Sequence, residues 1–337
     1  MKKTSIIFIA IIVFASNVFA QTENEIKREF IVQKNAKIRL SSSNKNLQIS
    51  SWKEDKVKVS FVLNNVDDKN SEDVFQKAGI DAGQLGNTVN ISINSSSIND
   101  KYKARTLIIY IPESAKLTAD SRYGNITFTN YFSNLDLDLT NVNVEAGNIS
   151  TLKLNSKYGN FNVGDIGSAQ VDFINGTFSA GNIDEMDLDT KYSNIEIASV
   201  KQLSFNSTND DYNIENAVNI QGRKNYGNMR ISELSGSIQL DGTNADVKIR
   251  NITASVREIK IDNKYASLQL PLKDLKDFVI DFIGAYSTVY APFEKTSKEL
   301  NGSSEGLNTG DHFTATVGRG AGAKVDVKCQ NCTVDFK

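Results

Sequence analysis

Hydrophobic and polar residues alternate in short runs along most of the chain, and these runs recur at a regular interval. The clearest copies start with Tyr-Gly-Asn or a close variant, at Tyr123, Tyr158, Tyr192, Tyr226 and Tyr265, and these tyrosines lie 34 to 39 residues apart. A weaker copy lies about halfway between each pair. Because strict alternation is typical of a half-buried strand, the pattern predicts a repeating coil of about 18 residues that contains short strands.

A coil of this size cannot bury its apolar side chains alone. Stacking it on a copy of itself pairs each strand with the coils on both sides and creates one continuous core. The sequence therefore predicts an all-β protein, folded as a parallel β-helix (β-solenoid) in which each coil is stacked on the next. The first apolar residue after each corner aligns as follows: Ile126, Val142, Phe161, Phe178, Ile195, Ile214, Met229, Val247, Leu268 and Val289.

The polar residue just before the aligned apolar position is most often asparagine. Stacked asparagines can donate and accept hydrogen bonds along a corner, so a structural role is expected for this column. The predicted asparagine ladder consists of Asn125, Asn160, Asn194 and Asn228, with Asn141 and Asn213 in intervening coils.

The repeat tyrosines and their neighbours offer two candidate binding surfaces. Tyrosines two coils apart, roughly 9.6 Å by strand spacing, are compatible with the sugar rings of a polysaccharide. Alternation along the strand favours burial of the tyrosines instead, because it places Tyr158 on the same face as Leu152 and Leu154. The residues directly before the tyrosines fall on the outward face of the strand. They form a predicted basic ladder that could bind an acidic polymer, although charges on an exposed strand face often serve only solubility. This basic ladder comprises Arg122, Lys157, Lys191 and Lys264, with Lys224 displaced by one place.

The motif Cys329-Gln-Asn-Cys332 has the spacing of thiol oxidoreductases. Aligned with the repeat, Cys329 falls on Tyr123 and Cys332 on Ile126, which turns both sulfurs inward in a terminal coil. We therefore expect a structural role, as a disulfide or as buried thiols at the end of the stack.

Carboxylates are the remaining candidates for catalysis, because the single histidine, His312, excludes sites that need two imidazoles. A pair of carboxylates could serve a polysaccharide lyase or hydrolase on a β-helix, and this remains an alternative function. The acids alternate with hydrophobic residues, however, and no long catalytic loops accompany them. We expect no enzyme activity, no cofactor and no metal. The acids in question are Asp136, Asp138, Asp172, Asp187 and Asp189.

The N-terminal residues indicate export. Residues 1–20 have two lysines, a short apolar run and a small-residue cleavage site, as in a signal peptide. The destination is the periplasm, the outer surface or the medium. No later stretch is apolar enough to cross a membrane, and a formal net charge of −2 does not favour nucleic acid.

The expected domains are an N-terminal β-region and a regular solenoid. The first covers residues 21–104 and includes an irregular insertion with a helix around Ser71 to Ala78. The second covers 105–337 and includes a polar loop near 293–312 and a terminal strand cap.

Several segments resemble a known family. They are NKNLQISSWKEDKVKVSF, RTLIIYIPESAKLTADSRYGNITF, KYGNFNV, KYSNIEI and NYGNMRI. The chain resembles the DUF4097-type, auto-transporter adhesin (head GIN domain) β-strand repeat proteins of bacterial envelopes. The resemblance implies a right-handed parallel β-helix, an exported location and an adhesin-like role without catalytic residues. We therefore expect a non-enzymatic protein that binds a glycan or other surface polymer, or an envelope protein. The alternatives are the lyase or hydrolase and a periplasmic accessory or sensor that acts through a protein partner.

Overall fold

The computed structural model describes residues 25–62, 71–94, 107–297 and 310–337, and this part of the chain is all-β apart from one short helix. The helix, α1 (Ser71–Lys77), confirms the helix predicted at this position. The signal peptide at 1–20, the domain boundary at 104/105 and most of the polar loop near 293–312 lie outside the described residues.

The strands are short at both ends of the chain and long in its middle, where β11 and β12 each run through several coils. In chain order they are β1 (Glu25–Ile31), β2 (Lys37–Trp52), β3 (Lys56–Val62), β4 (Ile80–Leu85), β5 (Thr88–Asn94), β6 (Leu107–Pro112), β7 (Lys116–Thr129), β8 (Phe132–Ala146), β9 (Ile149–Lys157), β10 (Phe161–Val163), β11 (Ile166–Thr208), β12 (Asp211–Ile252), β13 (Glu258–Lys264), β14 (Ser267–Gln269), β15 (Phe278–Ala285), β16 (Thr288–Tyr290), β17 (Thr296–Ser297), β18 (Gly310–Val317), β19 (Ala323–Gln330) and β20 (Thr333–Asp335).

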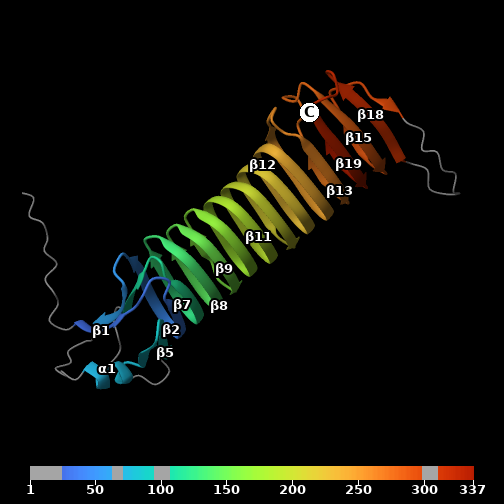
Figure 1. Cartoon of the computed structure of the whole chain (residues 1–337). Coiled ribbons are helices and arrows are strands. Elements are labelled where there is room, and N and C mark those ends of the chain that lie inside the picture. The colour runs from blue at the N-terminus through green and yellow to red at the C-terminus, as the bar shows by residue number, and fades with distance from the viewer. Residues whose placement is uncertain (1–24, 63–70, 95–106, 298–309) are drawn as a thin grey trace, which may run out of the picture.

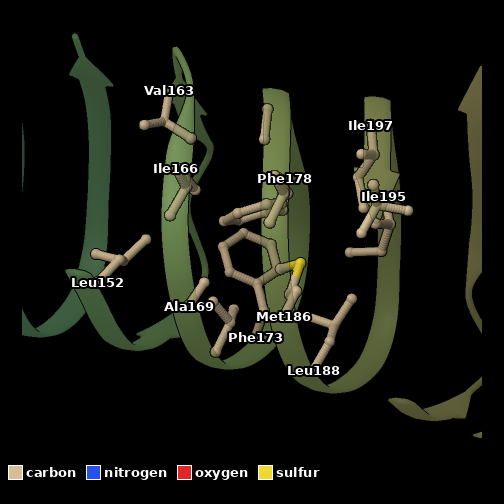
Figure 2. Close-up of a cluster of buried hydrophobic side chains, with 14 of the residues drawn as sticks. Leu152, Val163, Ile166, Ala169, Phe173, Phe178, Met186, Leu188, Ile195 and Ile197 are labelled. Carbon is tan, nitrogen blue, oxygen red and sulfur yellow. The ribbon is translucent and has the colours of Figure 1, made fainter. Parts of the chain in front are cut away.

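From β7 to β14 the chain forms a column of stacked coils (Figure 1). Neighbouring coils pair in parallel, and the partner of a residue lies about 17 or 18 positions further along, as for Leu135 and Leu152. Alternate side chains point inward and form a continuous hydrophobic core. Figure 2 shows part of this core, where Phe173 and Phe178 from successive strand segments meet edge to face at 5.9 Å.

Among the described residues, the coils from β2 to β16 each bend at a residue in the left-handed backbone region. Glycine, asparagine and aspartate adopt this conformation most easily, whereas a bulky side chain is rarely found there. Here tyrosine and asparagine alternate from coil to coil, with φ between 51° and 62°. In the order of stacking the bend residues are Asn44, Tyr123, Asn141, Tyr158, Asn175, Tyr192, Asn209, Tyr226, Asn244, Tyr265, Asn331 and Tyr286.

The stacking order departs from the chain order at the N-terminal end. Strand β2 lies between β5 and β7, so that Leu40 faces Ile91 on one side and Ala119 on the other. The outer coil, formed by β5 and β6, is covered by antiparallel strands: β4 pairs with β5, and β3 pairs with β6. Because a free strand edge can recruit another chain, these antiparallel strands protect the end of the stack.

The same departure occurs at the C-terminal end. Strands β19 and β20 lie between β13/β14 and β15/β16, so that Val327 faces both Ile261 and Phe282. Strand β18 then pairs antiparallel with β15. The expectation that the coil of Val289 follows directly on that of Leu268 is therefore wrong, because Val334 of the last coil lies between them.

The predicted alignment is wrong by two residues in two of the coils. The structure pairs Ile126 with Val144 rather than with Val142, and it pairs Ile195 with Tyr212 rather than with Ile214. A shift of two leaves every side chain on the same face of a strand, so the predicted inward positions remain correct.

Candidate binding surface along the stack

The repeat tyrosines lie in the left-handed bends with their side chains largely in solvent. Their exposed fractions lie between 51% and 59%, so the expected burial of these side chains is wrong. Strand alternation would place each tyrosine on the same inward face as the residue two positions before it. At the bend the backbone leaves the extended conformation, so the earlier residue is buried and the tyrosine points outward. Ser156, for example, is buried while Tyr158 is exposed. This tyrosine ladder comprises Tyr123, Tyr158, Tyr192, Tyr226, Tyr265 and Tyr286.

The four cations of the predicted basic ladder, Arg122, Lys157, Lys191 and Lys264, are exposed and directly precede tyrosines of the ladder. Acidic residues lie close to most of them. Asp120, Asp189 and Asp262 are exposed two positions before Arg122, Lys191 and Lys264, and alternation places each pair on the same face. In one pair the Arg122 Nε lies 3.7 Å from Asp120 Oδ1. The strip beside the tyrosines is therefore close to neutral.

Asparagine side chains join neighbouring coils just after the bend. Asn125 donates from Nδ2 to Asn46 Oδ1 at 2.9 Å and accepts from Asn143 Nδ2 at 3.1 Å. In other coils Asn160 Oδ1 accepts the backbone N–H of Thr177, and Asn194 faces Asp211. These bonds hold the coils in register.

The asparagine ladder differs from its predicted composition in two coils. Asn143 and Asp211 occupy the column in place of Asn141 and Asn213, as the corrected alignment requires. Asn228 donates both its backbone N–H and its side-chain amide to Asp211 Oδ1, at 3.0 and 2.7 Å. The side-chain hydrogen bond from Asn228 is the main cause of the lowered pKa of Asp211.

A shallow groove of roughly 1130 Å³ crosses nine coils on the face formed by the strands that precede the bends. Asp136 and Asp187 are among its charged residues, whereas Asp138, Asp172 and Asp189 are not among the lining residues. The described residues contain no group of three His, Cys, Asp or Glu arranged to hold a metal ion. Between Asp187 and Glu258 the groove has no charged lining residue, and its polar lining there consists of Gln202, Ser204, Asn219, Gln221, Ser237 and Gln239.

A polar cluster lies inside the stack, at the bends of three successive coils. The Asp210 carboxylate accepts hydrogen bonds from the hydroxyls of Thr190 and Ser207, both at 2.7 Å, and from the backbone N–H groups of Ser193 and Thr208. These bonds satisfy a carboxylate that is only 2% exposed.

Lys224 completes this cluster. Its Nζ donates to Ser207 Oγ at 3.2 Å and to the backbone oxygen of Asp210, and lies 4.9 Å from the centre of the Tyr212 ring. Burial lowers the pKa of Lys224 to about 8, and burial also raises the pKa of Tyr212. Sequence reasoning took Lys224 for a displaced member of the basic ladder. Its place two residues before the bend at Tyr226 is the signal that identifies it as inward-facing.

Cys329 and Cys332 form a disulfide, with 5.9 Å between their Cα atoms, and both side chains are buried. Their alignment was also wrong by two residues, because Cys329 faces Asn263 and it is Asn331 that adopts the left-handed bend. The coil that carries them does not end the stack, since β15 and β16 lie beyond it. The disulfide closes one bend inside the column.

Among the helices of the described residues, none has the length and apolar character needed to span a membrane. A search of curated proteins found no match. Among solved structures, a protein from Parabacteroides merdae described as a putative adhesin is 10% identical, with a TM-score of 0.43, and the match covers 71% of this chain and 96% of that one. A protein from Parabacteroides distasonis described as a putative lipid binding protein is 14% identical, with a TM-score of 0.37, and the match covers 72% and 94%.

The family comparison gives a firmer result than these distant structures. The model of the family described as Toastrack DUF4097 matches residues 35–317, which is most of the chain and includes both the stacked coils and the N-terminal segments that carry the resemblance. The match confirms the DUF4097-type resemblance. The chain therefore belongs to the Toastrack DUF4097 family.

Proposed function

We propose that the protein is an exported, non-enzymatic, adhesin-like right-handed β-solenoid that binds an extended surface polymer, or an envelope partner, along the side of its stack. In this proposal residues 1–20 direct export and are then removed. The regular stack acts as a rigid scaffold that repeats the same surface at every coil or every second coil.

One observation carries this proposal: exposed polar and aromatic columns run lengthwise over many coils. The groove alone spans nine coils, and the tyrosine ladder extends from β7 to the bend after β15. A surface with a regular repeat suits a ligand that also repeats, because each further unit then binds at a high effective concentration. A single small substrate would need a local pocket with converging groups instead.

The carboxylates give no specific support to the lyase or hydrolase. The acids proposed for catalysis lie on wide, open strand faces, where Asp138, Asp172 and Asp189 are exposed. Incubation of the protein with acidic and neutral polysaccharides should release neither new reducing ends nor unsaturated products. Release of either would overturn the non-enzymatic proposal.

The binding proposal predicts a dependence on ligand length. Purified protein should bind surface polymers immobilised in an array, and soluble oligomers should compete better as they grow longer, until they span the stack. Absence of binding to every glycan and cell-wall polymer would overturn polymer binding. Co-purification of one stoichiometric envelope protein, in the absence of polymer binding, would favour the accessory or sensor role.

A further inference from the structure

We propose that the six residues of the tyrosine ladder form a binding site for an uncharged, extended polysaccharide with a two-sugar repeat. This inference rests on the proposed function and deepens it, because it assigns the face of the stack and the class of polymer. Sugar rings would stack on the tyrosines, and the sugars between them would meet the bend asparagines.

The alternation of tyrosine and asparagine is a property of the stack and not only of the sequence. Tyr265 and Tyr286 occur in consecutive coils of the chain, yet the C-terminal coil lies between them and supplies Asn331 at the intervening bend. The same two-coil spacing is therefore kept at the point where the chain order is broken. A spacing that arose only from duplication along the chain would not be preserved there.

Backbone geometry alone does not account for the tyrosines at these bends. A left-handed bend disfavours a bulky side chain, and asparagine satisfies the same bend in every alternate coil. The tyrosines also recover little of this cost through burial, because each side chain is more than half exposed. Residues held in a disfavoured conformation without burial often have a functional role.

The spacing of the tyrosines along the stack suits a two-sugar repeat. Two strand spacings separate consecutive tyrosines of the ladder, which gives about 9.6 Å. In an extended β-1,4-linked glycan successive rings are turned over, so equivalent ring faces recur once per disaccharide, at a closely similar distance. Tyrosine offers an apolar ring face together with a polar hydroxyl, which suits a sugar. Each intervening asparagine offers an amide that can both donate and accept hydrogen bonds.

Carboxylates accompany most of the cations beside the tyrosine ladder. The cations beside the tyrosines would favour an acidic polymer if they stood alone. Asp120, Asp189 and Asp262 accompany three of the four, and Asp120 already contacts Arg122. An acidic chain along this strip would meet a carboxylate beside three of the four cations. The balance favours an uncharged glycan.

The test uses chitohexaose and cellohexaose as neutral probes, their disaccharides as short probes and hyaluronan as an acidic probe, with binding measured by calorimetry. Wild-type protein should bind at least one hexasaccharide, and should bind it more tightly than the matching disaccharide. The triple variant Tyr158→Asn, Tyr192→Asn and Tyr226→Asn keeps a residue that suits the bend. It should lose at least about 10-fold in affinity, since three stacking contacts are removed.

Two controls separate this site from other surfaces. Tyr131→Asn changes a tyrosine that is 43% exposed but lies outside the ladder, and Gln221→Arg changes the groove. Both should bind the hexasaccharide as the wild type does. Far-ultraviolet circular dichroism and urea unfolding establish that the triple variant is folded.

Several results would overturn the ladder. One is a folded triple variant with unchanged affinity, and another is loss of binding in Gln221→Arg alone, which would place the ligand in the groove. A preference for hyaluronan would exclude the uncharged ligand. Dimerisation of the wild type that the triple variant abolishes, without glycan binding, would make the ladder a contact between two copies. Failure of wild-type protein to bind either hexasaccharide would overturn the ladder as a site for a neutral glycan. Failure to bind any polymer would also overturn polymer binding in the proposed function and leave only the envelope partner.

Discussion

Tyr265 and Tyr286 are 21 residues apart in the sequence, yet they lie two coils apart in the stack because the C-terminal coil is inserted between them. At the other end β2 is similarly enclosed between β5/β6 and β7. At each end, a segment near the terminus of the described chain forms a coil inside the stack: β2 at one end and β19/β20 at the other. The outermost coil is formed by strands nearer the middle of the sequence, β5/β6 and β15/β16. Parallel pairing between segments that are distant in sequence is slow to form, so both ends of the stack are expected to complete late in folding.

The inserted C-terminal coil should be essential for stability. Val327 is fully buried between Ile261 and Phe282, and Val327→Ala removes two methyl groups that neighbouring coils cannot replace. We expect a loss of about 2 kcal/mol in the free energy of unfolding, measured in urea. Lys328→Ala, at the exposed neighbouring position, should change it by less than about 0.5 kcal/mol. Equal effects of the two substitutions would contradict the observed pairing.

The left-handed bends predict a specific order of tolerance at Tyr226, where φ is 62°. Asparagine should be accepted without loss, because it already occupies the bends of the adjacent coils. A β-branched side chain is strongly disfavoured in this region, so Tyr226→Val should reduce the free energy of unfolding by about 1 to 2 kcal/mol. Thermal unfolding of Tyr226→Asn and Tyr226→Val compares the two directly. Better tolerance of valine than of asparagine would show that this bend does not persist in solution.

Close stacking of the bends makes Gly159 hard to replace. A Cβ added at Gly159 would lie 2.0 Å from the backbone oxygen of Val142 in the preceding coil. The Gly159→Ala variant must therefore move the backbone, and we expect it to lose more than about 2 kcal/mol of stability. Gly83 has open space around the same position, so Gly83→Ala should be neutral or slightly stabilising. Chemical denaturation of both variants tests whether adjacent bends approach this closely.

The sequence was sufficient to predict the repeat, the short helix and the inward face of the strands, because burial imposes a period of two that is visible in the residues themselves. The same period explains the errors. A shift of two residues leaves that pattern unchanged, so Val142, Ile214 and Cys332 were aligned with the wrong partners. The residue in the left-handed conformation fixes the register of each coil, and it is tyrosine and asparagine in alternate coils. The predicted alignment instead matched asparagines to the third residue of Tyr-Gly-Asn. In coils whose bend residue is itself an asparagine, this can shift the alignment by two residues.

The order of the coils at the ends could not be derived from the pattern. An inserted coil and a consecutive one have the same alternation, since both bury one face of each strand. Only the pairing of distant segments distinguishes them, as between β13 and β19. The tyrosines were misplaced for a local reason, because alternation was continued through a bend at which the backbone leaves the extended conformation.

The buried cluster predicts an unusual dependence of stability on pH. The lowered pKa of Lys224, about 8 in the folded protein against 10.5 as its ordinary value, means that the folded state releases this proton at a lower pH than the unfolded state does. Stability contributed by this group must therefore rise with pH between about 8 and 10.5, by at most about 3 kcal/mol. The free energy of unfolding, measured in urea at several pH values, should follow this rise.

The variant Lys224→Met provides the control, because methionine has a similar length and no titrating group. Other ionisable groups, including Tyr212 and Asp210, remain in both proteins, so subtracting the variant's pH profile from that of the wild type isolates the contribution of Lys224. The difference should grow in favour of the wild type as the pH rises above 8. A constant difference across this range would show that Lys224 keeps its ordinary pKa and that its ammonium group is solvated rather than buried beside Ser207 and Tyr212.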